Sequence, residues 1–234
     1  MKNILAIDTA TEACSVALML NSGTAEQVIF ERFELCPQQH SQRLLPMVDE
    51  LLSEAQVTLK SLDMLAFGRG PGSFTGVRIA TGMIQGLAFG TQLPVVGVST
   101  LAAMAQQALE EQQQHHVAAA IDARMDEVYL GCYQHADGLM VPVTQEQVLP
   151  PSQAIETLEQ GGAHWYGVGT GWGAYPALNQ FRKTESVAQI LYPRARYMLP
   201  LAIAAFARGE AVTAAKAEPV YLRDKVTWKK LPGR

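Results

Sequence analysis

The sequence has few charged residues and few cysteines. Charged residues make up 17% of the 234 residues and the formal net charge is -4, so no global field draws the chain to nucleic acid or to anionic lipid. The three cysteines, Cys14, Cys36 and Cys132, show neither CxxC nor metal-ligand spacing, which fits a reducing compartment. We therefore expect a cytoplasmic protein, and any hold on RNA must come mostly from another molecule.

Long apolar runs and metal motifs are also lacking. Asp8 and Glu12 interrupt the apolar segment 4–20, so neither a signal peptide nor the roughly 20 apolar residues of a membrane span is predicted. The five histidines form no HExxH motif and no pair at i, i+4 spacing, and no metal site is expected. In residues 72–76, GSFTG, the serine is one position away from that of a nucleophile elbow, which argues against a peptidase.

One glycine-rich stretch dominates the pattern, residues 68–78 with the sequence GRGPGSFTGVR. Pro71 presets φ for the second position of a β-turn, and Gly72 can supply the positive φ that a type II turn needs next. Ser73 or Thr75 can cap the helix that follows. A strand, a turn and a helix N-terminus in this order can hold an anion, so a phosphate site is one hypothesis for the stretch.

The helix predicted over residues 77–89 has an unusually large apolar surface. Its polar side chains, Arg78, Thr81 and Gln85, fall on one narrow stripe. Glycines on the helix each cost roughly 0.8–1 kcal/mol relative to alanine, and close approach of another helix would offset that cost. Two interpretations stay open: a core helix between two layers of its own domain, or a helix with a partner protein on its second face. That second face carries Ile79, Gly82, Met83, Gly86 and Gly90.

Alternating strand and helix signals predict an α/β fold with mixed sheets. The polar run 110–116 is the expected boundary between an N-terminal lobe, residues 1–112, and a C-terminal lobe with a basic tail, residues 113–234. The pattern at residues 6–9, AIDT, recurs at 120–123 as AIDA, and each is followed by a returning strand, which suggests a duplication. Strands are predicted over 4–7, 13–20, 25–35, 61–67, 95–98, 120–122, 128–133 and 164–168, and helices over 40–55, 77–89, 99–109, 152–159 and 198–208.

Short oxygen-bearing side chains follow the first strand. Asp8, Thr9 and Thr11 could bind a phosphate or orient a metal-bound water, and with Asp122 across a cleft between the lobes they would form an ATP site. The other interpretation is that both turns are simply closed by Asx-type hydrogen bonds. No Lys-Ser/Thr pair follows the glycines as it would in a Walker loop. An independent ATPase or kinase that uses the Asp8 turn stays open.

These motifs together resemble those of the bacterial TsaB (YeaZ) family. The similar segments are residues 7–11 (IDTAT), the stretch 68–78, residues 97–101 (GVSTL) and residues 218–223 (EPVYLR), so the similarity extends from the first strand to the tail. The resemblance implies the two-lobed actin-like ATPase fold (ASKHA, ribonuclease H-like), with duplicated mixed β-sheets flanked by helices. It also implies a role in forming N6-threonylcarbamoyladenosine (t6A) at position 37 of tRNA.

The resemblance further implies a subunit without catalytic activity of its own. It would bind and activate the transferase TsaD together with TsaE, contact tRNA indirectly through the complex, and form a homodimer when TsaD is absent. Thr100 and Met104 stand where TsaD has two metal-binding histidines, and neither ligates such a metal. Asp8, Thr9 and Thr11 are therefore expected to be vestigial, and no cofactor is implied except ATP or ADP at the partner interface.

The family places its partner surface on the first two helices, here residues 40–55 and 77–89. We therefore expect the interface to contain Leu44, Leu45, Val48, Leu52, Arg78, Ile79, Gly82, Met83, Gly86 and Gly90.

Overall fold

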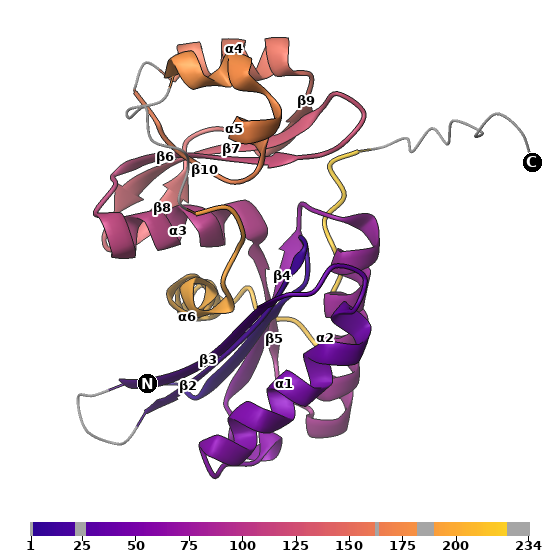
Figure 1. The fold of residues 1–234 in the computed structure, drawn as a ribbon. Helices are drawn as coiled ribbons and strands as arrows, with labels where there is room; N and C mark the ends of the chain where they lie inside the picture. The colour runs from indigo at the N-terminus through magenta and orange to yellow at the C-terminus, as the bar shows by residue number, and fades with distance from the viewer. Residues whose placement is uncertain (1, 22–26, 162–163, 182–189, 224–234) are drawn as a thin grey trace, which may run out of the picture.

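Two β-sheets, each at the centre of one lobe, organise the chain in the computed structural model (Figure 1). The structure describes residues 2–21, 27–161, 164–181 and 190–223. The first sheet has the strand order β3-β2-β1-β4-β5. Its strands are β1 (Ile4–Asp8), β2 (Ala13–Asn21), β3 (Gln27–Leu35), β4 (Met64–Gly70) and β5 (Val95–Ser99).

The second sheet repeats the arrangement of the first. Its order is β10-β6-β7-β8, and β9 pairs with β7. In the first sheet β1 is antiparallel to β2 and parallel to β4, and in the second β6 is antiparallel to β7 and parallel to β10. The predicted duplication of mixed sheets is therefore confirmed. The strands are β6 (His116–Asp122), β7 (Val128–Ala136), β8 (Leu139–Pro142), β9 (Gln147–Leu149) and β10 (Tyr166–Val168).

Helices cover both faces of the first sheet because its strands are apolar on both sides. Leu5 and Ile7 of β1 pack with α1 and α2, whereas Ile4 and Ala6 pack with α6 on the opposite face (Figure 1). α3 lies between the lobes and packs on the second sheet, whose outer face is covered by α4 and α5. The helices are α1 (His40–Glu54), α2 (Phe74–Thr91), α3 (Thr100–Gln112), α4 (Pro151–Gln160), α5 (Gly171–Ala174) and α6 (Met198–Ala207).

The turn between β4 and α2 differs from the predicted one. The positive φ is at Gly70, with a φ of 101°, and the bond between Gly70 and Pro71 is cis, so the prediction of a type II turn with positive φ at Gly72 is wrong. The helix begins at Phe74, earlier than predicted, and Ser73 is its cap: Ser73 Oγ accepts a hydrogen bond from the Gly76 amide at 3.3 Å.

The second half of the chain does not stay in the second lobe. The predicted boundary at residues 112 and 113 falls between α3 and β6, but α6 packs against the first sheet. Val212 then forms an isolated antiparallel bridge with Val95 of β5. The chain afterwards passes α2 and rises to the second lobe, as the yellow segment of Figure 1 shows. Most of the predicted basic tail, residues 224–234, lies outside the described residues.

Glycines of the 68–78 stretch allow the β4–α2 turn to pack directly on the β1–β2 turn. A Cβ atom on Gly68 would lie 1.8 Å from Asp8 Oδ2, and one on Gly76 would lie 2.0 Å from the carbonyl oxygen of Thr9. Thr9 Oγ1 also donates a hydrogen bond to the Gly76 carbonyl at 2.7 Å. Gly76 therefore meets the backbone of the β1–β2 turn and Gly68 meets the Asp8 side chain, with no room for a further side chain at either glycine.

Alanine at two glycines of α2 should have opposite effects on stability. Gly76→Ala pushes a methyl group into the Thr9 carbonyl and should lower the free energy of unfolding by roughly 2–3 kcal/mol. Gly82→Ala places a methyl group where no described atom lies within 4 Å, and should raise it by up to about 1 kcal/mol. Urea denaturation of both variants measures the difference, and equal effects would contradict this account of the turn.

Candidate functional site

α2 has one buried face and one exposed apolar face. Val77, Ile84 and Ala88 are at most 1% exposed and pack in the core of the first lobe. On the other side Phe89 is 76% exposed, and Cβ atoms added to Gly82, Gly86 or Gly90 would meet no described atom within 4 Å. The described residues therefore do not enclose this helix. We call this side the α2 face; it consists of the exposed Gly82, Gly86, Phe89 and Gly90 with the half-buried Ile79 and Met83, which also pack against the core.

α1 contributes less to the surface than expected. Leu44 and Val48 are 0% and 4% exposed and fill the core beneath α1. They therefore do not lie on a surface that a partner could contact, and we leave them out of the candidate interface. Leu45 is 43% exposed and Leu52 is half-buried, so these two predicted residues remain available beside the α2 face.

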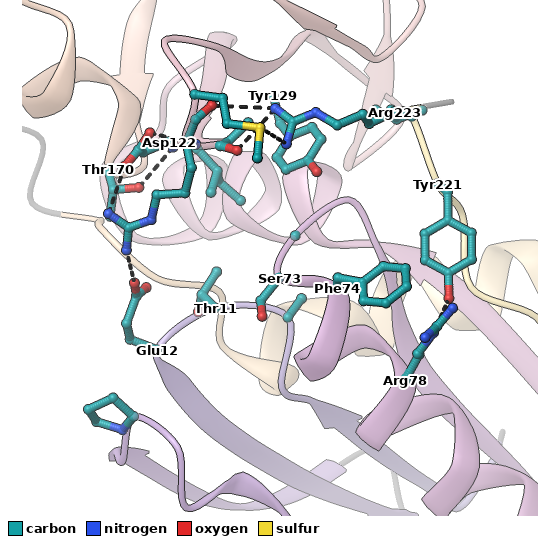
Figure 2. A pocket seen from close by; sticks show the side chains of 18 of the residues that line it. Thr11, Glu12, Ser73, Phe74, Arg78, Asp122, Tyr129, Thr170, Tyr221 and Arg223 are labelled. Carbon is teal, nitrogen blue, oxygen red and sulfur yellow. Dashed lines mark hydrogen bonds and ion pairs between the residues drawn. The ribbon is translucent and has the colours of Figure 1, made fainter. Parts of the chain in front are cut away.

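Two aromatic rings flank Arg78 at the N-terminal end of α2 (Figure 2). The guanidinium carbon lies 3.5 Å from the centre of the Phe74 ring and 5.6 Å from that of Tyr221. Arg78 Nε donates a hydrogen bond to Tyr221 Oη at 2.8 Å. Phe74 and Tyr221 are 45% and 44% exposed. Neither ring is predicted as a site residue from the sequence, since Tyr221 is 143 residues from Arg78 and no spacing rule links them.

Asp8 and Thr9 are sealed inside the first lobe. Both are 0% exposed. Asp8 Oδ1 accepts from the Ala10 amide at 2.8 Å, and Asp8 Oδ2 accepts from Thr100 Oγ1 at 3.3 Å. Burial raises the pKa of Asp8 from 3.8 to about 7, although these two hydrogen bonds work in the opposite direction. The polar atoms of both side chains are thus bonded within the chain.

A cleft of about 1070 Å³ lies between the lobes, and it receives only part of the predicted nucleotide site. Thr11 and Asp122 line it, but Asp8 and Thr9 do not. Asp122 Oδ1 accepts from the Arg124 amide at 2.9 Å, just as Asp8 Oδ1 accepts from Ala10. Both turns are therefore closed by Asx-type hydrogen bonds, and the structure does not bring the two aspartates together in one cleft.

Arginines partly close this cleft (Figure 2). Arg124 Nη2 lies 3.4 Å from Glu12 Oε1 of the first lobe, and Arg124 Nη1 lies 3.2 Å from Asp122 Oδ2 of its own turn. Arg223 contacts Glu127 and donates to the Ala123 carbonyl at 3.1 Å. The carboxylates around the cleft are thus engaged by arginines that belong to the chain itself.

Metal ligands do not gather in the described part of the chain. Its His, Cys, Asp and Glu side chains form no group of three or more that could hold a metal ion. Thr100 and Met104 are both 0% exposed, and Thr100 donates to Asp8. The described helices also include none that is long and apolar enough to cross a membrane.

Comparison with known proteins gives consistent matches along the chain. A family model described as "TsaD: tRNA N6-adenosine threonylcarbamoyltransferase" matches residues 32–230. The chain is 50% identical over 235 residues to the tRNA threonylcarbamoyladenosine biosynthesis protein TsaB of Escherichia coli (strain K12), with 99% of both chains covered. The protein of the same name from Haemophilus influenzae (strain ATCC 51907 / DSM 11121 / KW20 / Rd) is 46% identical over 244 residues, with 99% of this chain and 98% of the relative covered.

A solved structure has the same fold. The structure described as "YeaZ from Pseudomonas aeruginosa" superposes with a TM-score of 0.81 at 51% identity, covering 95% of this chain and 100% of that one. The agreement includes both lobes, and the predicted two-lobed actin-like α/β fold is confirmed.

Replacing Asp8 by asparagine should change how stability depends on pH. The folded chain keeps Asp8 protonated up to about pH 7, whereas the unfolded chain releases this proton near pH 3.8. The unfolding free energy of the parent should therefore fall as the pH rises from 4 to 7. Asparagine cannot ionise, so Asp8→Asn removes the free-energy cost of ionising the buried Asp8 carboxyl. This cost is on the order of 4 kcal/mol for the whole pKa shift from 3.8 to about 7.

Urea denaturation at pH 5 and pH 8 measures this effect. The stability gap in favour of Asp8→Asn should be larger at pH 8, and the exposed Asp49→Asn of α1 serves as the control for an amide substitution. A gap that does not grow between the two pH values would contradict the burial of Asp8 as the cause.

Proposed function

The chain belongs to the TsaB family of tRNA threonylcarbamoyladenosine biosynthesis proteins, and we propose that it acts in t6A formation as a non-catalytic subunit that binds and activates the transferase TsaD. The α2 face is the observation that carries this proposal. Three glycines and a 76% exposed phenylalanine leave an apolar, side-chain-poor strip on the outside of the first lobe. Such a strip is suited to another helix at close range.

The glycines of the α2 face support the proposal of a partner, because no described residue packs where their side chains would be. Gly68 and Gly76 are required by close contacts within the chain, but Gly82, Gly86 and Gly90 face open space. Glycine inside a helix costs roughly 0.8–1 kcal/mol relative to alanine. A partner backbone that approaches this strip closely would offset that cost. The proposed interface consists of Leu45, Leu52, Arg78, Ile79, Gly82, Met83, Gly86, Phe89 and Gly90.

Arg78 extends this surface towards the interlobe cleft. Its guanidinium is packed against Phe74 and hydrogen-bonded to Tyr221. Exposed aromatic and arginine side chains are the types that dominate binding energy at protein interfaces. We place the edge of the TsaD contact here, next to the apolar strip.

The other members of the complex follow from this assignment. TsaE joins the TsaB–TsaD pair, and tRNA binds through the assembled complex, which the net charge of -4 favours over direct binding by this chain. ATP or ADP at the TsaD interface remains part of the proposal. When TsaD is absent, the α2 face pairs with a second copy of the chain. We place this assembly in the cytoplasm.

The alternative is an independent ATPase or kinase that uses the Asp8 turn. It has less support, because Asp8 and Thr9 are 0% exposed and bonded internally. A residue must reach the substrate to act on it, and these two side chains lie outside the lining of the cleft.

Substitutions at Gly86 should separate folding from binding. Gly86→Ala fills open space, so it should raise the unfolding free energy of the isolated chain by up to about 1 kcal/mol. The same methyl group should weaken TsaD binding by roughly 10-fold, about 1.4 kcal/mol, because it holds the partner helix away. Gly86→Glu adds a charge that the interface would bury, and should reduce binding roughly 100-fold or more and abolish t6A formation.

Calorimetry with TsaD and a t6A assay measure both effects. Gly173→Glu, at an exposed glycine of α5 that also faces open space, is the matched control and should leave both unchanged. Survival of both TsaD binding and t6A formation in Gly86→Glu would place the interface elsewhere.

Titration of the isolated chain with ATP and magnesium tests the alternative. We expect no tight binding, since Asp8 and Thr9 are sealed and only Thr11 of this turn lines the cleft. Tight binding that Asp8→Ala abolishes would favour the ATPase over the subunit.

A further inference from the structure

The last described residues, 217–223, form a strap along the first lobe and α2. Gln85 of α2 donates from Nε2 to the Ala217 carbonyl at 2.8 Å. The Val220 amide donates to the Arg69 carbonyl of β4 at 2.7 Å. Tyr221 accepts from Arg78, and its ring lies 5.6 Å from that of Phe74. The strap is thus attached to the helix that carries the α2 face.

The same strap ends on the second lobe. Arg223 donates to the carbonyl oxygens of Ala123 and Arg124 at 3.1 and 3.4 Å and pairs with the carboxylate of Glu127. Its side chain is only 16% exposed. Arg223 Nη1 also contacts Met125 Sδ at 3.8 Å. One guanidinium therefore contacts four acceptors of the turn between β6 and β7, at the edge of the cleft that Arg223 lines (Figure 2). We call residues 122–127 the Asp122 turn.

The Asp122 turn has a backbone that needs such support. Arg124, Met125 and Asp126 have φ values of 61°, 57° and 58°. Three successive residues with side chains in the left-handed region are unfavourable unless surrounding contacts hold them there. The Ala123 amide donates to the Glu127 carbonyl at 2.9 Å, and Arg223 binds the outer carbonyls of the same turn. Arg223 is therefore placed to keep the turn in its strained form.

Helix α3 and the ion pair between Arg124 and Glu12 also connect the two lobes. α3 packs on both sheets and joins the lobes through buried side chains. Across the cleft, Arg124 lies 3.4 Å from Glu12, but the Arg124 side chain is 76% exposed and this pair is screened by water. The contacts of Arg223, whose side chain is 16% exposed, are thus better placed to hold the two sides of the cleft together.

We propose that Arg223 and the strap act as a clasp: they set the distance between the lobes and couple the Asp122 turn to the α2 face. Arg223 holds the turn, Tyr221 holds Arg78 at the start of α2, and the short segment between them transmits movement of one lobe to the other. The coupling to partner binding rests on the proposed function, whereas the clasp between the lobes does not. Arg223 is a positioning residue, because it acts on the α2 face through the strap.

Spin labels can report the distance between the lobes in the full chain. Ser53→Cys on α1 and Glu156→Cys on α4 are at exposed positions, and the native Cys14, Cys36 and Cys132 are buried and should stay unlabelled. Dilution with unlabelled chain restricts the measurement to one copy. Arg223→Ala should broaden the distance distribution and move it to longer values.

Hydrogen exchange provides a second, local readout. In Arg223→Ala the amides of residues 123–127 and 76–81 should exchange at least 10-fold faster, because the clasp joins both segments. Arg223→Lys should restore part of the protection, since the lysine ammonium can pair with Glu127 but lacks the planar guanidinium whose Nη2 contacts both carbonyls. Arg208→Ala, which removes an exposed ion pair with Glu210 inside the first lobe, is the matched control and should change neither segment.

A double-mutant cycle tests the role of the strained turn. Glycine adopts positive φ without strain, so Asp126→Gly relieves one of the three positive-φ residues of the turn, and the turn should depend less on Arg223. The 10-fold effect of Arg223→Ala on residues 123–127 should then shrink to less than 3-fold. Strictly additive effects would contradict the claim that Arg223 supports the turn, because independent sites add.

TsaD affinity separates the clasp from the proposed function. Arg223→Ala should weaken TsaD binding 5- to 10-fold, with Arg208→Ala unchanged. Unchanged spin-label distances and exchange rates in Arg223→Ala would overturn the clasp. Altered distances with unchanged TsaD affinity would overturn the coupling alone. If Arg223→Ala alters the distance between the lobes but Gly86→Glu still binds TsaD fully, the clasp is supported and the proposed function is rejected.

Discussion

The backbone contact between the β1–β2 turn and the β4–α2 turn is the constraint on which the rest of the structure depends. It requires that Gly68 and Gly76 have no side chain, since added Cβ atoms would lie 1.8 and 2.0 Å from Asp8 and Thr9. This contact sets the direction in which α2 leaves the sheet. It also covers Asp8 and Thr9 completely. One packing arrangement therefore buries the residues that suggest chemistry and orients the helix that carries the exposed apolar face.

The same arrangement changes how the glycine-rich stretch is understood. A strand, a glycine turn and a helix N-terminus could hold an anion, but here the space is filled by the neighbouring turn of the chain. An aspartate with a pKa raised to about 7 by burial is a component of the core. The glycines further along α2 have a different role, because a Cβ atom added to any of them would meet no described atom within 4 Å. The proposed function therefore uses this outward face and not the buried aspartate.

Much of the fold follows from local patterns. The strands, the main helices and the internal repeat are readable because apolar periodicity and turn residues are local properties. The two faces of α2 were also predictable from the helical period. The period of α1, in contrast, could not indicate which apolar residues meet the sheet, and Leu44 and Val48 proved to be core residues. The turn at Pro71 was mispredicted because tertiary contact, not turn propensity, determines which glycine has positive φ.

The sequence by itself determined the order of the longer strands and helices, though not β8, β9 and α5, together with the duplication, the family motifs and the excess apolar surface of α2. Only the tertiary structure decided that Asp8 is sealed, that residues 195–217 return to the first lobe, and that Tyr221 and Arg223 tie α2 to the Asp122 turn. The physical reason is distance along the chain. Arg78 and Tyr221 are 143 residues apart, and such contacts depend on how the lobes fold against each other, which no local pattern encodes.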